Sequence, residues 1–320
     1  MSGLAIGDAL GRPVEGMSAE AIREKYGSVK DFLLLSPGGS DDTEYALLTA
    51  SAILKYGLDI TADQFAQYWK DFVCTQKGAF IGAGFSEMCA IDNLRNGLKP
   101  PFSGQHPHSW SDGLAMRVAP IGIVGAGNLP LTLTMTMADG QVSHSGEGIW
   151  SGQAIAAAIS VAMVGASPQE AFAQALLAVP EDSWINRNLI KVERIVSDSA
   201  GKTSAELVDL LLYAVAVEDY YYADLAPEAV SLALAAVLYG DGDFARTLLF
   251  AVNLGRDADT IAAMAGAVAG ALVGYEAIPE SWRVAIQSVK GSCLEFAAGL
   301  NPVVVAVKLA ELVQTKGSQV

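Results

Sequence analysis

The chain has 320 residues, of which 52% are hydrophobic and only 17% charged, and its formal net charge is −15 at pH 7. This composition indicates a large buried core rather than disorder, and the negative charge argues against non-specific nucleic-acid binding, which requires a basic surface. Cys74, Cys89 and Cys293 show neither paired nor metal-type spacing, and no signal peptide is present, so we expect reduced thiols in a cytoplasmic protein.

Helices are predicted along most of the chain, bounded by capping residues, glycine and proline. The first ends near Pro13, which places Glu15 in the loop that follows. Strand signals are weak and no linker marks a boundary, so we expect an all-α fold, a single large orthogonal bundle with residues 1–320 as one domain. The expected helices cover residues 3–11, 18–26, 42–57 and 61–73, one ending at 97, then 149–164, several within 167–218, 227–240, 244–253, one running to 273, and two within 279–313.

Two apolar stretches bear on membrane insertion. Residues 118–138 carry no charge, but Pro120, Pro130 and several Gly and Thr within them predict a loop and a short helix. Residues 261–275 are too few, because a spanning helix needs about 20 apolar residues. We therefore expect no membrane span. The aromatic cluster at residues 220–222 could belong to the core or stack on a base.

A pair of carboxylates opens the last long apolar run. Asp257 and Asp259 sit one residue apart, Thr260 follows, and glycines then recur every four residues from 266 to 274, on one helix face that lets another helix approach closely. Like charges ~4 Å apart repel by roughly 4 kcal/mol at an effective dielectric near 20. Either a divalent cation offsets this repulsion, or Asp259 or Thr260 only caps the helix. Oxygen ligands of this kind suit Mg²⁺, Mn²⁺ or Ca²⁺.

A second cluster has the same build. Ser40, Asp41, Asp42 and Thr43 again combine hydroxyls with paired carboxylates, and again they precede an apolar run. Two such clusters, far apart in sequence and each at the start of a predicted helix, suggest one composite site for two metal ions.

A third stretch, from Gly3 to Gly16, completes a recognisable pattern. Together the three stretches resemble the ADP-ribosylglycohydrolase family, which includes the dinitrogenase-reductase-activating hydrolases. The family's G-x-x-x-G-D-A-x-G-x-x-x-E pattern is matched by Gly3, Gly7, Asp8, Ala9, Gly11 and Glu15, and its G-x-D-x-D-T pattern by Gly255, Asp257, Asp259 and Thr260. Its T-D-D-T pattern corresponds to Ser40 to Thr43, where Ser40 replaces the usual Thr and keeps the hydroxyl.

The resemblance implies a hydrolase that cleaves the glycosidic bond at the anomeric carbon of an ADP-ribosyl group, through an oxocarbenium-like transition state. It also implies two divalent cations, Mg²⁺ or Mn²⁺. Glu15, Asp41 and Asp257 are the expected catalytic residues. Glu15 is either a further ligand or the group that orients water or substrate, because nearby cations keep a carboxylate ionised and make it a poor general acid. The expected metal ligands are Ser40, Asp41, Asp42, Asp257, Asp259 and Thr260.

Five further residues are expected to bind substrate. Asp112 and Gly113 stand in a segment similar to the family's N-G-x-x-M-R-x-x-P, with Asp112 replacing the usual Asn. His144 and Ser145 lie among polar and glycine residues, close to where the family also has a histidine. Arg256 stands where a small residue is common and could contact an anionic ligand or block one. The simpler interpretations are a turn at Asp112 and a structural role for His144.

Other classes of function stay open. A hydrolase of small N-ribosides or other N-glycosides on the same two-metal site would need no pyrophosphate pocket, which fits the few basic residues near the motifs. A non-catalytic ADP-ribose-binding or structural protein and a two-metal phosphohydrolase are the remaining alternatives. We expect an ADP-ribosylated protein or a small ribosyl compound as the partner, and neither nucleic acid nor membrane. The acceptor atom, the metal and the oligomeric state are left open by the sequence.

Overall fold

The computed structural model describes residues 1–35, 37–220 and 223–317. Within these ranges the regular elements are helices, and β pairing is limited to two isolated bridges, Ser18 with Gly255 and Ser111 with Leu225. The prediction of an all-α fold is confirmed. The elements are α1 (Ser2–Gly11), η1 (Arg12–Val14), α2 (Ala19–Tyr26), α3 (Asp41–Tyr56), α4 (Ala62–Phe72), α5 (Phe85–Arg95), η2 (Phe102–Gly104), η3 (Ala115–Arg117), α6 (Ala119–Val124), α7 (Leu129–Ser143), α8 (Glu147–Ala162), α9 (Pro168–Leu177), α10 (Trp184–Ser197), α11 (Ser204–Val215), α12 (Ala226–Gly240), α13 (Phe244–Val252), α14 (Ala258–Val273), η4 (Tyr275–Ala277), α15 (Glu280–Ala285), η5 (Glu295–Ala297) and α16 (Pro302–Gly317).

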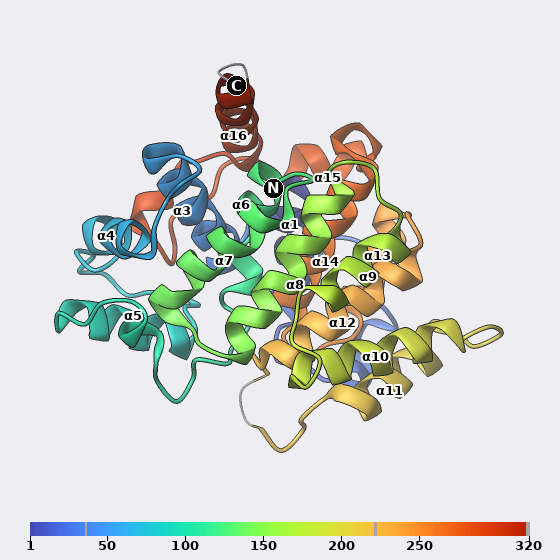
Figure 1. Cartoon of the computed structure of the whole chain (residues 1–320). Coiled ribbons are helices and arrows are strands. Elements are labelled where there is room, and N and C mark those ends of the chain that lie inside the picture. The colour runs from blue at the N-terminus through green and yellow to red at the C-terminus, as the bar shows by residue number, and fades with distance from the viewer. Residues whose placement is uncertain (36, 221–222, 318–320) are drawn as a thin grey trace.

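Helix α14 lies at the centre of the bundle (Figure 1). Its residues from Ala258 to Ala269 are all buried, and α1, α8, α12 and α13 pack around it. The helix is apolar on every side, as a helix enclosed by others must be. The only charged side chain in this buried part of α14 is Asp259, so its carboxylate lies in the interior of the protein.

Helices α1 and α14 pack along faces of glycine and alanine. A Cβ atom added to Gly3, Gly7 or Gly11 would collide with the backbone of α14, because the two backbones lie closer together than side chains would allow. The sequence predicted this close approach for Gly266 and Gly270, which both face Gly3. Gly274, by contrast, caps the C-terminus of α14 with a φ of 80°.

The start of α3 is fixed by a carboxylate from its own first turn. Glu44 is buried and accepts the N–H groups of Cys293 at 2.9 Å and Leu294 at 2.7 Å, together with that of Ser292 at 2.8 Å. The chain that leads into α16 therefore holds the N-terminus of α3 against the bundle. Asp41 and Asp42 begin α3 and are buried at this position.

Residues 118–138 differ from the prediction of a loop with one short helix. The structure forms α6 and then α7, which continues to Ser143. Pro130 lies in the first turn of α7, where proline is well tolerated, and Asn128 caps the helix by accepting the Leu131 N–H. No helix in the described residues is long and apolar enough to cross a membrane. Tyr221 and Tyr222 of the predicted aromatic cluster lie outside the described residues.

The glycine contact between α1 and α14 generates a test with a matched control. Gly7→Ala should destabilise the protein by about 1–3 kcal/mol or more, because the new methyl group has no space against Ala262. Gly270→Ala places its methyl group at an ordinary distance, 3.5 Å from the nearest atom, so helix propensity should leave stability equal or slightly higher. Thermal unfolding of both variants checks this. Equal melting temperatures would contradict the packing described.

Candidate active site

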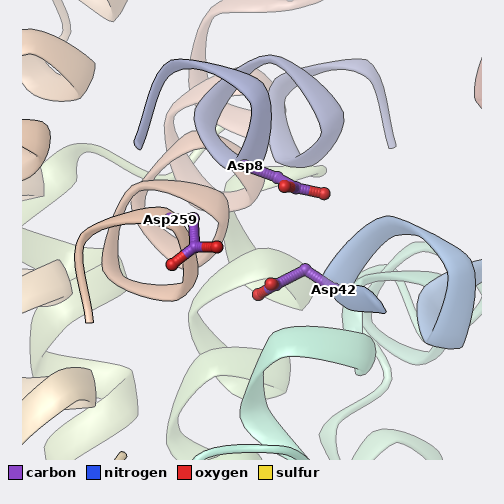
Figure 2. Close-up of side chains that lie close together, drawn as sticks. All are labelled: Asp8, Asp42 and Asp259. Carbon is purple, nitrogen blue, oxygen red and sulfur yellow. The ribbon is translucent and has the colours of Figure 1, made fainter. Parts of the chain in front are cut away.

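Three buried carboxylates from three helices meet at one point. Asp8 comes from the middle of α1, Asp42 from the first turn of α3 and Asp259 from the first turn of α14, and their side chains point toward one another (Figure 2). One oxygen from each lies within 4.8 Å of the others, and the three side chains are 0%, 1% and 3% exposed. We refer to these three residues as the carboxylate core.

Asp8 ties α1 to the start of α3. Its carboxylate accepts the Ser40 N–H at 2.8 and 2.9 Å, the Thr43 N–H at 3.2 Å, and also the Thr43 hydroxyl. Burial raises the pKa of Asp8 to about 6, and the hydrogen bonds from Thr43 and Ser40 partly oppose that rise. In the sequence Asp8 stands out only as part of a motif, and it was not predicted as a residue of the site.

A second carboxylate group adjoins the core and shares Asp259 with it. Glu15, Asp257 and Asp259 each offer an oxygen within 4.8 Å of the other two. Glu15 lies just after η1, in the loop that Pro13 predicted, and Asp257 immediately precedes α14. The two sequence clusters and the N-terminal motif therefore meet in space, as the sequence suggested.

The electrostatics of this site are those of uncompensated negative charge. Burial raises the pKa of Asp41, Asp42, Asp257 and Asp259 well above the usual value, and in each case neighbouring carboxylates raise the pKa further. Asp42 Oδ1 and Asp259 Oδ1 are buried without a hydrogen-bond partner in the described part of the chain. A donor set made only of carboxylate and hydroxyl oxygens, with free lone pairs, fits a hard divalent cation.

Four of these five carboxylates, those of Glu15, Asp42, Asp257 and Asp259, line a cavity of about 680 Å³, and Asp8 is buried outside its lining. Of the residues predicted for the site, the cavity wall contains Glu15, Asp41, Asp42, Asp112, Gly113, Arg256, Asp257, Asp259 and Thr260. Ser40 does not line this wall. It is buried directly behind it, where its hydroxyl donates to Asp42 Oδ2 at 3.0 Å.

His144 and Ser145 do not line the cavity, contrary to the expectation that they contact substrate. His144 is fully buried, with Nε2 3.1 Å from the Ser111 hydroxyl and Nδ1 2.8 Å from the Ser143 hydroxyl. Burial, and next the positive charge of Arg117, lower its pKa well below the usual value, so the imidazole is neutral. Ser145 donates to the Ser109 hydroxyl. Polar, glycine-rich neighbours in the sequence do not distinguish a wall residue from one directly behind the wall.

Arg256 lines the cavity, but its guanidinium is already paired with another side chain of the protein. Its φ of 61° lies in the left-handed region, and its guanidinium forms an ion pair with Glu228 at 2.6 Å and donates to the Val217 carbonyl. The backbone of Arg256 accepts the Gly16 N–H and donates to the Met17 carbonyl, both at 2.8 Å. Arg256 therefore holds the loop that carries Glu15 beside Asp257, and its side chain is committed to Glu228.

Glu87 and Asp224 are among the acidic residues of the wall that the sequence did not predict. Glu87 is buried and pairs with Arg117 at 3.3 Å, and Arg117 in turn pairs with Asp139 at 3.1 Å. The backbone oxygen of Asp224 accepts the Asp112 N–H at 2.9 Å. Neither residue belongs to a motif, and only their place in the fold brings them to the cavity.

The chain is similar to one protein family, to curated relatives and to a solved structure. The model of the family described as ADP-ribosylglycohydrolase matches residues 1–318. The chain is 26% identical to "ADP-ribosylarginine hydrolase Tri1" of Serratia proteamaculans over 88% of this chain and 72% of that protein. It is 29% identical to "ADP-ribosylhydrolase ARH3" of Homo sapiens over 79% of this chain and 74% of that protein. A solved "ADP-ribosylglycohydrolase-related protein complex" has the same fold, with a TM-score of 0.67 at 24% identity over 97% of this chain and 95% of that one.

The buried pairing of Arg117 can be tested through stability. Arg117→Met leaves Glu87 and Asp139 buried without their partner, which should cost about 3–5 kcal/mol. The control is Arg194→Gln, which removes an exposed arginine paired with Asp198 and should change little. Denaturant unfolding of both variants measures the difference. An Arg117→Met protein as stable as the unmodified chain would show that the pairing has no role in holding the wall.

Proposed function

The chain belongs to the ADP-ribosylglycohydrolase family, and from this premise we propose that it is a divalent-cation-dependent hydrolase that releases ADP-ribose from a guanidinium-bearing acceptor. The observation that carries the proposal is the meeting of the carboxylate core with Glu15 and Asp257 in one open cavity. Two relatives whose names state ADP-ribosyl hydrolysis support it, one of them an ADP-ribosylarginine hydrolase.

Cations would be held by the residues that now carry uncompensated charge. The carboxylate core could hold one ion, and Asp257 with Asp259 a second one beside Glu15, so that Asp259 is common to both. Thr260, at the cavity wall, and Ser40, behind it, place hydroxyl oxygens near the same carboxylates. Bound divalent cations supply positive charge that orients ribose hydroxyls and stabilises negative charge that develops during cleavage.

Different residues would then act on the water and on the cations. Glu15 lies in a loop held by the backbone of Arg256, which anchors this loop beside the start of α14. A carboxylate in this position can accept a proton from water and orient it toward the anomeric carbon. The closed helix packing behind the core excludes bulk water from the opposite side, which strengthens each electrostatic contact. We therefore assign Glu15 to the water and Asp42, Asp257 and Asp259 to the cations.

The acceptor side of the cavity supports a cationic leaving group. Glu87, Asp112 and Asp224 line the wall, and Glu218 adds an exposed carboxylate to it. Asp112 Oδ2 is buried without a hydrogen-bond partner in the described residues. Burial, and next the charge of Asp224, raise the pKa of Asp112 well above its usual value, which a bound cation would reverse. A guanidinium matches carboxylates of this kind in both charge and planar geometry.

One observation favours a second candidate, a small N-riboside without a pyrophosphate. The three arginines nearest the motifs are all engaged inside the protein. Arg12 donates to the Gly39 carbonyl, Arg117 pairs with Glu87 and Asp139, and Arg256 pairs with Glu228. Because these three guanidinium groups already have partners, a bound pyrophosphate would have to be stabilised by backbone N–H groups and bound cations.

A substrate panel separates the two candidates. ADP-ribosylarginine, ADP-ribosylserine and simple N-ribosides should be assayed with Mg²⁺, with Mn²⁺ and with excess chelator. We expect ADP-ribosylarginine to be cleaved fastest and chelator to abolish turnover. Asp224→Asn should raise KM for ADP-ribosylarginine more than for ADP-ribosylserine, because it removes wall charge that only a cationic acceptor uses. Cleavage of simple ribosides alone would favour the second candidate, and full activity in chelator would refute the cation requirement.

The role of Glu15 is tested by comparison with Asp259. Glu15→Gln keeps the shape of the side chain and should lower kcat by about 10²–10⁴-fold while Mn²⁺ affinity stays nearly unchanged. Asp259→Asn touches both carboxylate groups and should weaken Mn²⁺ binding first, with turnover partly restored by excess Mn²⁺. Calorimetric titration of Mn²⁺ beside turnover measurements distinguishes the two variants. Loss of an ion in Glu15→Gln, with rescue by excess Mn²⁺, would make Glu15 a ligand instead.

A further inference from the structure

A second cavity, of about 320 Å³, lies between α2 with the loop that follows it and α11, α12 and α13. Its described lining residues include the basic residues Arg23, Lys30 and Arg246 and no acidic residue. The chain as a whole has 35 acidic and 20 basic residues. The charge of this wall is therefore opposite in sign to the net charge of the protein and to the charge of the first cavity's wall. The two cavities share none of these lining residues.

The guanidinium of Arg246 is oriented by aromatic rings, and the only carboxylate shown to contact this residue in the described chain, that of Asp243, accepts its backbone N–H. Its guanidinium lies over the ring of Tyr239 at 4.2 Å, and that ring stacks on Phe250 with centroids 4.1 Å apart. In the described part of the chain, no carboxylate lies within ion-pair distance of Arg246 or Lys30. Stacking orients a guanidinium but leaves its N–H groups free to donate.

The remaining walls of this cavity also favour an anion. Arg23 pairs with Asp209 at 2.9 Å, but both side chains are exposed, and such pairs exchange partners at little cost. Ser204 and Ala205, in the first turn of α11, line the cavity as well. Glu206 in the same turn caps this helix, because its carboxylate accepts the Thr203 N–H and its own N–H donates to the Thr203 hydroxyl. The positive charge of the wall therefore comes from the three basic side chains.

We propose that this second cavity binds a phosphate-bearing anion, of the size of a diphosphate or the diphosphate end of a small metabolite. Three separate cationic side chains around one small cavity match an anion with several oxygens better than a single carboxylate. The lining rings of Tyr239 and Phe250 stack on each other, and Arg246 lies over Tyr239, so the wall serves the charged end of a ligand rather than a base. The site does not depend on the reaction proposed for the first cavity.

Calorimetric titration of the whole protein with pyrophosphate tests the proposal. Chelator should be present throughout, so that no cation in the first cavity can attract the anion. We expect saturable binding that Lys30→Gln and Arg246→Gln each weaken by about tenfold or more, since each removes a charged donor. Arg194→Gln, at an exposed arginine on α10 outside this cavity, is the matched control and should bind as the unmodified chain does.

Separate titrations with inorganic phosphate and with ADP-ribose, each repeated on Lys30→Gln so that ADP-ribose bound in the first cavity is accounted for, show whether a free anion or the diphosphate of a larger molecule is the better ligand of the second cavity. If Arg246→Gln fails to fold because Tyr239 loses its stacking partner, Lys30→Gln, which is exposed, still decides the question. The proposal would be overturned if titration with pyrophosphate gave no more heat than titration with sodium chloride of equal ionic strength. Equal affinity in Lys30→Gln and the unmodified chain would overturn it too.

Discussion

The structure depends on the close approach of α1 to α14, which places the carboxylates of Asp8 and Asp259 together in the interior. Glycines on α1 allow that approach, because any side chain there would collide with the backbone of α14. Two like charges ~4 Å apart repel by roughly 4 kcal/mol even at an effective dielectric near 20. The close packing that stabilises the two helices therefore also brings together two carboxylates that repel each other.

The other residues of the site are arranged around these two repelling carboxylates. Asp8 uses its carboxylate to hold the start of α3 through Ser40 and Thr43, so the same group that carries the charge also positions Asp42. Arg256 adopts a left-handed conformation and pairs its side chain with Glu228, while its backbone holds the loop of Glu15 beside Asp257. The carboxylates are buried, and two of their oxygens have no hydrogen-bond partner among the described residues, which supports the view that cations complete the assembled site.

Much of this arrangement could be predicted from the sequence, because the decisive residues are local signals. Paired aspartates at two helix starts predict a composite site, and glycines at helical spacing predict a close helix contact. Proline near the start of α7 was misleading, since the first turn of a helix accepts it. His144 was misplaced because sequence neighbours do not reveal which side of a wall a side chain occupies. Glu87 and Asp224 could not be found, because only long-range packing brings them to the cavity.

If the buried carboxylates at the junction of α1, α3 and α14 hold divalent cations, crystals of the protein grown with Mn²⁺ should show the ions by anomalous X-ray diffraction. We expect one manganese peak among Asp8, Asp42 and Asp259 and a second one at Asp257 and Asp259, beside Glu15. Well-ordered crystals that show no anomalous peak at either position, at saturating Mn²⁺, would contradict this expectation.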